Sequence, residues 1–397
     1  MQLRLSKTPE LLAPVGGKEQ LLAAVNFGAD AVYLATNKFG MRAKAQNFKL
    51  EEIPEIVEFA HNNNVKVYVT VNILMHDDDI QELPDYFKSL VDAGVDAFII
   101  GDMGAVAVAK KIAPNVAIHI STQASVANSE ACKVWEQIGA SRIVLAREMS
   151  LEQIKALDTN LDLEAFVHGA MCMSVSGRCL ISSYLTGRSA NKGACTQPCR
   201  WGYSLLEEKR PRQQFDIGED NFGTYIMNSK DMNMLMHLDK VCDAGISSIK
   251  IEGRNKKALY VATVVNAYRH VLDGENPKKW VGELDKVSHR PYSTGFYFGE
   301  AEQSPDYDGY EQECVHVGDV LDDGKILCRN HFEEGETLEA LIPGGDVCEV
   351  KVTGLSYNNK PVEVANRAKE IYEIDTKLKK GSLLRSKTFL RTSRTVC

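Results

Sequence analysis

The sequence has no apolar run long enough to cross a membrane and no excess of basic residues. A membrane-spanning helix needs about 18 or more consecutive apolar residues, and no stretch of this chain approaches that length. The formal net charge is −8, from 46 Lys and Arg against 54 Asp and Glu. No global positive field therefore attracts nucleic acid or a membrane surface, and any contact with nucleic acid requires a local basic patch.

Several targeting and catalytic signatures are also missing. Residues 6–12 are polar and then strand-like, so they do not form a secretory signal. We therefore expect a cytoplasmic, reducing location, in which disulfides are rare. The chain contains no G-x-S-x-G, H-E-x-x-H or Walker sequence, which are the short signatures of common hydrolases and nucleotide-binding proteins.

Eight short apolar runs alternate with helical patterns along the first two thirds of the chain. Each run is flanked by turn residues, as buried parallel strands are. The runs are residues 10–15, 31–35, 66–71, 97–101, 118–122, 142–147, 163–167 and 248–252. Eight such units predict an α/β fold, a (β/α)8 TIM-like barrel over residues 1–273.

The connection after the seventh strand is far longer than the usual 2–6 or so residues of such loops. We expect an insertion over residues 170–247 that opens with cysteines and closes with a helix near residues 231–244. The eighth helix is expected at residues 258–272. Beyond it, short strands separated by glycine turns predict a small C-terminal antiparallel β-barrel over residues 290–397.

Four of the ten cysteines lie close together at the start of this insertion: Cys172, Cys179, Cys195 and Cys199. Zinc and iron–sulfur clusters both accept four thiolates. Structural zinc sites usually have a close cysteine pair on each half, and the pair Cys172 and Cys179 is too widely spaced for that. The spacing therefore favours a cluster over zinc, with free buried cysteines as a further alternative.

Barrel enzymes carry their chemistry at the C-terminal ends of the strands, and in this chain those ends are polar. His168 ends the seventh strand, where it is either a satisfied core histidine or a catalytic residue. Arg147 with Glu148, and Glu252 with Arg254, either pair with each other to hold the rim or contact a substrate.

The sequence resembles family thirty-two of the unclassified peptidases, also called collagenase-like proteases, over nearly its whole length. Two segments, Cys195-Thr-Gln-Pro-Cys199-Arg-Trp201 and the stretch at residues 223–231, most resemble the tRNA hydroxylation branch. The other segments that carry the resemblance are Glu10-Leu-Leu-Ala-Pro-Val-Gly-Gly17, Gly28-Ala-Asp-Ala-Val-Tyr33, Glu164-Ala-Phe-Val-His-Gly-Ala-Met-Cys172, Ser176-Gly-Arg-Cys179 and Lys250-Ile-Glu-Gly-Arg254.

This resemblance implies a [4Fe–4S] cluster on Cys172, Cys179, Cys195 and Cys199. It also implies oxygen-independent hydroxylation of the wobble uridine of tRNA to 5-hydroxyuridine, with prephenate as the hydroxyl donor. The segment at residues 200–222 is shorter than in some hydroxylases, so the chain is expected to act either alone or with a homologous partner chain. The alternatives are a collagenase-like peptidase, an anaerobic hydroxylase of the ubiquinone-biosynthesis type, and an RNA-binding protein whose cluster is only structural.

Prephenate carries two carboxylates, which need cationic partners when they are buried, and arginine binds a carboxylate through two donors. We expect Arg147 and Arg254 to bind it, with Arg42 and Gln123 as further substrate contacts. Glu252 and His168 are the candidate catalytic residues, and His168 could pass a proton. The candidate tRNA-binding residues all lie in the insertion: Arg178, Arg188, Lys192, Arg200, Lys209, Arg210 and Arg212.

Overall fold

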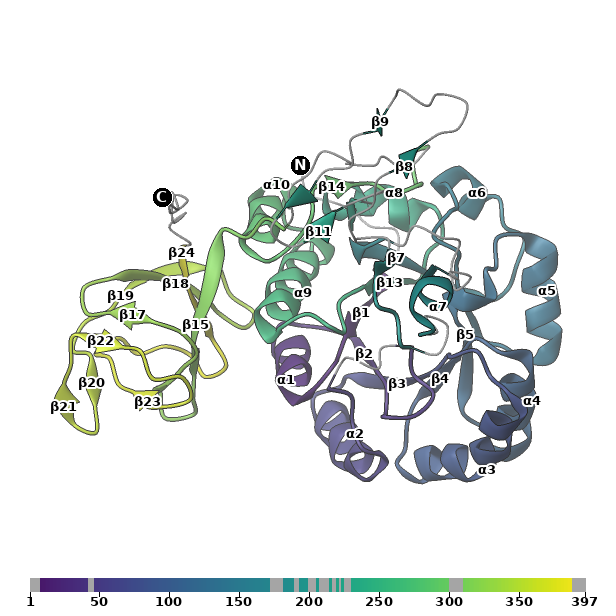
Figure 1. Ribbon diagram of the computed structural model, residues 1–397, viewed down its shortest axis with the longest axis horizontal. Helices are drawn as coiled ribbons and strands as arrows, with labels where there is room; N and C mark the ends of the chain where they lie inside the picture. Colours follow the sequence, from purple (N-terminus) through teal and green to yellow (C-terminus); the bar gives the residue numbers. More distant parts are fainter. Residues whose placement is uncertain are drawn as a thin grey trace.

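The computed structural model describes two units, a closed barrel and a smaller β-sheet unit beside it (Figure 1). The residues described are 8–41, 46–171, 181–188, 193–198, 230–299 and 310–387, with two-residue pieces at 205–206, 214–215, 219–220 and 223–224. All structural statements below concern these residues.

The barrel is formed by eight parallel strands that pair neighbour to neighbour. The strands are β1 (Glu10–Pro14), β2 (Ala31–Leu34), β3 (Lys66–Val71), β4 (Ala97–Ile100), β5 (Ala117–Ile120), β6 (Arg142–Val144), β7 (Asp162–Ala170) and β13 (Ser248–Ile251). Strand β13 pairs with both β1 and β7, which closes the barrel. The predicted (β/α)8 barrel is confirmed.

Helices surround the barrel in the order expected from the alternating pattern (Figure 1). They are α1 (Lys18–Asn26), α2 (Ile53–Asn62), α3 (Asp77–Asp92), α4 (Met103–Ile112), α5 (Ser129–Ile138), α6 (Leu151–Lys155), α8 (Leu238–Asp243) and α9 (Ala258–Leu272). In α2 the side chains of Ile53, Ile56, Val57 and Ala60 are buried, which is the i, i+3, i+4, i+7 spacing of a helix face on a sheet. None of the described helices combines the length and apolarity needed to cross a bilayer.

Helix capping explains where two of these helices begin. The Asp102 carboxylate accepts a hydrogen bond from the Ala105 amide (3.0 Å) at the start of α4. The Asn128 side chain accepts one from the Ala131 amide (2.9 Å) at the start of α5. Each cap satisfies a backbone donor that has no partner within the helix.

The region around the insertion departs from the predicted pattern. Strand β7 extends to Ala170, and its last residues pair antiparallel with β12 (Asp231–Asn233), which in turn pairs with β14 (Tyr292–Ser293). The predicted helix over 231–244 was therefore wrong for its first residues, since α8 starts at Leu238 after the short η5 (Leu235–His237). The buried Asp231 pairs with Arg290 (2.7 Å), and this contact joins β12 to the segment that leads into β14.

The C-terminal sheet unit is an antiparallel six-stranded sheet in the order β19-β18-β24-β15-β16-β23. The predicted small antiparallel β unit is therefore confirmed. It has the form of a half-barrel, because its edge strands β19 and β23 do not pair with each other in the described part of the chain. The strands are β15 (Cys314–Val320), β16 (Ile326–Cys328), β18 (Thr337–Leu341), β19 (Cys348–Lys351), β23 (Ile371–Tyr372) and β24 (Leu383–Lys387).

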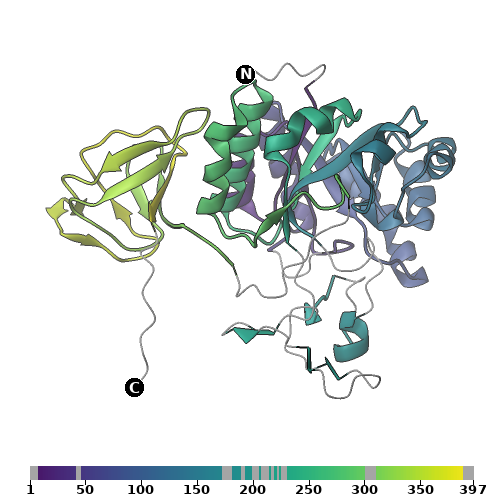
Figure 2. The same ribbon diagram turned by 90° about the horizontal axis from the view of Figure 1, so that it is seen from above.

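The two units lie side by side next to α9 (Figures 1 and 2). The short η6 (Val281–Lys286) supplies ionic contacts between them. Leu341 and Leu383 of the sheet unit pack into the hydrophobic core of the barrel. The fully buried Arg385 pairs with Glu339 (2.9 Å) and with Glu283 of η6. Apolar and ionic contacts together therefore join the two units.

Candidate active site

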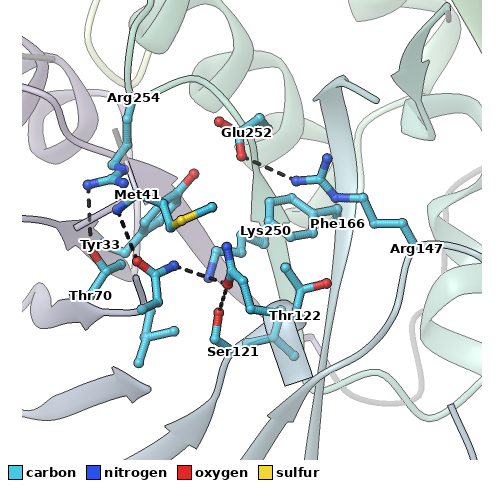
Figure 3. Close-up of a pocket in the computed structure, with 14 residues that line it drawn as sticks. Tyr33, Met41, Thr70, Ser121, Thr122, Arg147, Phe166, Lys250, Glu252 and Arg254 are labelled. Atoms are coloured by element: carbon cyan, nitrogen blue, oxygen red, sulfur yellow. Dashed lines mark hydrogen bonds and ion pairs between the residues drawn. The ribbon is translucent and has the colours of Figure 1, made fainter. Parts of the chain in front are cut away.

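A cavity of about 430 Å³, its open mouth included, lies inside the barrel at the C-terminal ends of the strands (Figure 3). Most of the side chains that line it are polar, as the polar strand ends predicted. Arg147, Arg254, Gln123 and Glu252 all line it. Barrel enzymes bind substrates at this end of the strands, so this cavity is the candidate active site.

Arg147 is held by contacts on three sides. Its Nη1 donates to the Ala170 carbonyl (3.0 Å), its Nη2 lies 3.3 Å from a Glu252 carboxylate oxygen, and its guanidinium carbon lies 3.9 Å from the centre of the Phe166 ring. Arg147 thus pairs across two strands with Glu252, instead of with its sequence neighbour Glu148. A buried guanidinium fixed in this way presents its remaining edge to a ligand in one orientation.

Arg254 faces the cavity from the opposite side (Figure 3). It is buried, and its Nη1 lies 3.5 Å from the Thr70 hydroxyl of β3. The side-chain oxygen of Gln123 accepts hydrogen bonds from Asn72 Nδ2 (3.1 Å) and from the Ser121 hydroxyl. Asn72 in turn accepts from the Met41 amide (3.2 Å). Cationic side chains therefore lie on two opposite sides of the cavity, and a chain of amides and hydroxyls lines part of the wall.

Lys250 lies at the floor of the cavity and was not among the residues predicted. Its Nζ is 2.6 Å from Glu164, which also lies 3.3 Å from Arg142 Nη1. Arg142 pairs further with Glu10 at 2.6 Å. Burial lowers the pKa of Lys250, and the Glu164 carboxylate opposes this shift. A signal was present in the sequence, because Lys250 and Glu252 alternate on one strand and must point to the same side of the sheet.

His168 lies outside the cavity, between β7 and α9. Its Nδ1 is 3.4 Å from the Tyr268 hydroxyl, and the Tyr292 ring is 5.5 Å away between centroids. Burial lowers the pKa of His168 to about 3, so its ring is neutral near pH 7. The pairing of β7 with β13 shifts register between Lys250 and Ile251, and Phe166 lines the cavity while His168 faces the helix layer. The structure therefore separates His168 from the residues predicted to act with it.

Of the four clustered cysteines, the structure describes Cys195, which is half-buried. The Gln197 amide donates to its Sγ at 3.4 Å, and the Thr196 amide donates to Ser182 of α7 (Ile181–Thr186) at 3.1 Å. An amide that donates to sulfur stabilises a thiolate, so Cys195 is suited to be a cluster ligand. In the described residues no three His, Cys, Asp or Glu side chains are grouped to hold a metal ion.

Several predicted site residues lie outside the described ranges. Among the proposed tRNA contacts, Arg188 is described, and its side chain is exposed. The residues outside are Arg42, Cys172, Cys179, Cys199, Arg178, Lys192, Arg200, Lys209, Arg210 and Arg212.

Comparison with known proteins assigns most of the chain to one family. Residues 16–306 match Peptidase family U32, and residues 312–385 match the Peptidase family U32 C-terminal domain. The chain is 40% identical over 365 residues to tRNA hydroxylation protein P1 of Bacillus subtilis, covering 85% of each chain. It is 32% identical over 397 residues to tRNA hydroxylation protein P of Escherichia coli, covering 85% of this chain and 87% of that one.

A third relative acts on a different RNA. The 23S rRNA 5-hydroxycytidine C2501 synthase of Escherichia coli is 38% identical over 281 residues, covering 70% of this chain and 41% of that protein. Both family matches and the two relatives that cover 85% of the chain agree with the resemblance inferred from the cysteine and strand-end motifs. The chain therefore belongs to peptidase family U32.

Proposed function

We propose that this protein is an RNA-hydroxylating enzyme that converts the wobble uridine of tRNA to 5-hydroxyuridine without dioxygen. The observation that carries the proposal is its similarity, over most of its length, to proteins named for tRNA hydroxylation. The relative named as an rRNA 5-hydroxycytidine synthase supports RNA hydroxylation more broadly.

Prephenate is the hydroxyl donor in this proposal, and the barrel cavity is its binding site. Arg147 and Arg254 line opposite sides of the cavity, so each can meet a different carboxylate of the acid. Glu252 orients Arg147 through its carboxylate. The Phe166 ring lines the same cavity and supports the Arg147 guanidinium, whose carbon lies 3.9 Å from the centre of the ring.

A [4Fe–4S] cluster is the proposed cofactor, held by Cys172, Cys179, Cys195 and Cys199. When bound it supplies one-electron redox chemistry. The amide that donates to Cys195 Sγ supports this assignment.

Mass spectrometry of nucleosides from purified tRNA of a deletion strain tests the function. We expect 5-hydroxyuridine and nucleosides derived from it to disappear, and a plasmid with the wild-type gene to restore them. Loss of 5-hydroxycytidine from rRNA, with tRNA unchanged, would show that the substrate is a different RNA. If this chain alone fails to restore the nucleoside in a heterologous deletion strain, a homologous partner chain is required.

Peptidase activity is the second candidate, because the family is named for it. Four of the six described cysteines are poor nucleophiles. Burial raises the pKa of the Cys242 thiol to about 11 and also raises the pKa values of Cys132, Cys314 and Cys328, whereas a nucleophilic cysteine needs a lowered pKa. Cleavage of a collagen peptide by protein stripped of iron would favour the peptidase.

A further inference from the structure

Lys250 occupies an unusual position for a lysine, in the middle of the barrel interior. It lies on β13, it is buried, and it lines the cavity floor between Arg147 and Arg254 (Figure 3). Barrel interiors are usually filled by layers of branched apolar side chains. A buried lysine and its carboxylate partner are costly to desolvate, and well-packed apolar residues in their place often give equal or greater stability. The stability of the barrel therefore does not explain why a lysine occupies this position.

The surroundings of Lys250 hold its ammonium in one place. Glu164 accepts a hydrogen bond from Nζ at 2.6 Å from the side away from the cavity mouth. The rings of Tyr33 and Phe166 flank the ammonium, with centroids 4.4 Å and 5.5 Å from Nζ. An ammonium has three donors, and Glu164 accepts one of them. A ligand in the cavity can accept another.

The charge of the cavity wall points to an anionic ligand. Three cationic side chains line it, Arg147, Lys250 and Arg254, against a single carboxylate from Glu252 among the described residues. The Glu164 carboxylate, which pairs with Lys250, offsets one of these three positive charges. The wall therefore keeps an excess of positive charge, which a small carboxylate would balance in a site shielded from water.

We propose that Lys250 is a substrate-binding residue of this cavity, and that its ammonium donates a hydrogen bond to a carboxylate oxygen of the bound acid. Glu164 keeps the ammonium charged and directed at the ligand from behind. This inference rests on the proposed function for the identity of the acid, prephenate, and adds a third cation to the two arginines already assigned to it.

Calorimetric titration of the purified full chain with prephenate tests the proposal. Lys250→Met should weaken binding about tenfold or more, because it removes a hydrogen bond to a charged group. That variant also leaves the buried Glu164 with Arg142 as its remaining cationic partner. A loss of binding could therefore reflect damage to the fold. The double variant Lys250→Met/Glu164→Gln removes both charges together and avoids this uncompensated carboxylate.

Lys250 either binds the substrate or only forms a structural ion pair with Glu164, and the two roles predict different prephenate affinities for the double variant. A substrate-binding lysine predicts that the double variant still binds prephenate about tenfold or more weakly, although its thermal stability approaches that of the wild type. Wild-type affinity in the double variant would overturn the proposal and make the pair structural. Lys286→Met is the matched control, since Lys286 forms a comparable pair with Glu339 (2.8 Å) at the junction of the two units. It should leave prephenate affinity unchanged.

Failure of the proposed function is distinguishable from failure of this inference. If the wild type does not bind prephenate, the donor is wrong, and the same proteins are titrated with 2-oxoglutarate as a generic dicarboxylate. A selective loss of that binding in the double variant supports the role of Lys250. If neither acid binds to the wild type, the inference is overturned as well.

Discussion

At the scale of single residues, Arg147 combines a structural and a ligand-facing role. It bridges the end of β7 to Glu252 and packs on Phe166, yet it also lines the cavity. A residue that only held the rim could be replaced by another cation, whereas a planar fork that binds a carboxylate through two donors could not.

Replacing either cavity arginine with lysine tests this distinction. We expect Arg147→Lys or Arg254→Lys to raise the prephenate concentration for half-maximal tRNA hydroxylation about tenfold, with the fold and iron content unchanged. Arg269→Lys is the control, because Arg269 pairs with Asp30 and Asp273 on the outer surface. An unchanged prephenate dependence in both cavity variants would return the two arginines to a structural role.

The position of His168 leads to a prediction about how the stability of the protein depends on pH. Its pKa in the folded protein is about 3 because it is buried, below its usual value of about 6.5 in an unfolded chain. The unfolded state therefore binds a proton first as the pH falls, and stability is lost between pH 6.5 and 3. Between pH 6.5 and 4.5 the loss from this residue is on the order of 2 kcal/mol.

The variant His168→Phe should show a shallower loss of unfolding free energy over that pH range, measured by urea denaturation. Some dependence should remain, because burial also lowers the pKa of His119 well below its usual value. A pH dependence identical to that of the wild type would contradict the assignment.

At the scale of elements, β7 approaches the end of β13 so closely that one position must be glycine. Gly169 has φ +101°, and a Cβ there would lie 2.6 Å from the Glu252 carbonyl oxygen. Such a contact is too short for a real side chain, so the backbone that carries Glu252 would have to move. Because Glu252 orients Arg147, the cavity depends on this glycine.

We expect Gly169→Ala to lower the unfolding free energy by at least about 2 kcal/mol and to weaken prephenate binding. Gly245→Ala is the matched control, since Gly245 also has a positive φ (+85°) but no described atom within 4 Å of the added Cβ. That control should cost about 1 kcal/mol from backbone strain and leave binding unchanged. Equal effects of the two substitutions would show that the close approach is not important.

The cysteine-bearing insertion makes a prediction of its own. Anaerobically purified protein should be brown and hold about four irons and four sulfides per chain. Single alanine substitutions of Cys172, Cys179, Cys195 or Cys199 should each abolish the colour, whereas Cys348→Ala, an exposed cysteine of the C-terminal sheet unit, should not. Stoichiometric zinc without sulfide would instead identify a zinc site.

At the scale of the whole molecule, a buried ionic cluster joins the barrel to the C-terminal sheet unit. Arg385 is fully buried between Glu283 and Glu339, and Lys286 pairs with the same two carboxylates. Arg385→Met removes the buried cation and leaves the two partly buried carboxylates with Lys286 alone, which should cost on the order of 3 kcal/mol. We expect the sheet unit of this variant to unfold at a lower urea concentration than the barrel. Amide hydrogen exchange, measured separately for the two units as the urea concentration rises, checks this.

An exposed ion pair of the same unit serves as the control for that experiment. Lys380 pairs with Asp322 at 2.8 Å, with both side chains largely exposed. Surface pairs of this kind contribute little, so Lys380→Met should leave the urea midpoint almost unchanged. A similar small effect from Arg385→Met would show that the apolar contacts of Leu341 and Leu383 suffice to join the units.

The sequence alone determined the barrel, its order of elements and the rim that carries the cavity. The predicted boundaries of β3 and α9 agree with the structure, because a period of two or of 3.6 residues is a local property of the chain. The residues at the strand ends could also be predicted to line the cavity. In a closed parallel barrel all C-terminal strand ends meet on one face, so Arg147, Arg254, Gln123 and Glu252 converge without further information.

Only the tertiary structure decided which way side chains face and what they pair with. His168 was predicted to be either a core histidine or a catalytic residue, and the register shift between β7 and β13 accompanies its turn toward α9. The Arg147 pair with Glu252 and the Lys250 pair with Glu164 each join strands more than eighty positions apart in sequence. Such partners are set by register and barrel closure, which depend on packing across the whole sheet and leave no local pattern in the chain.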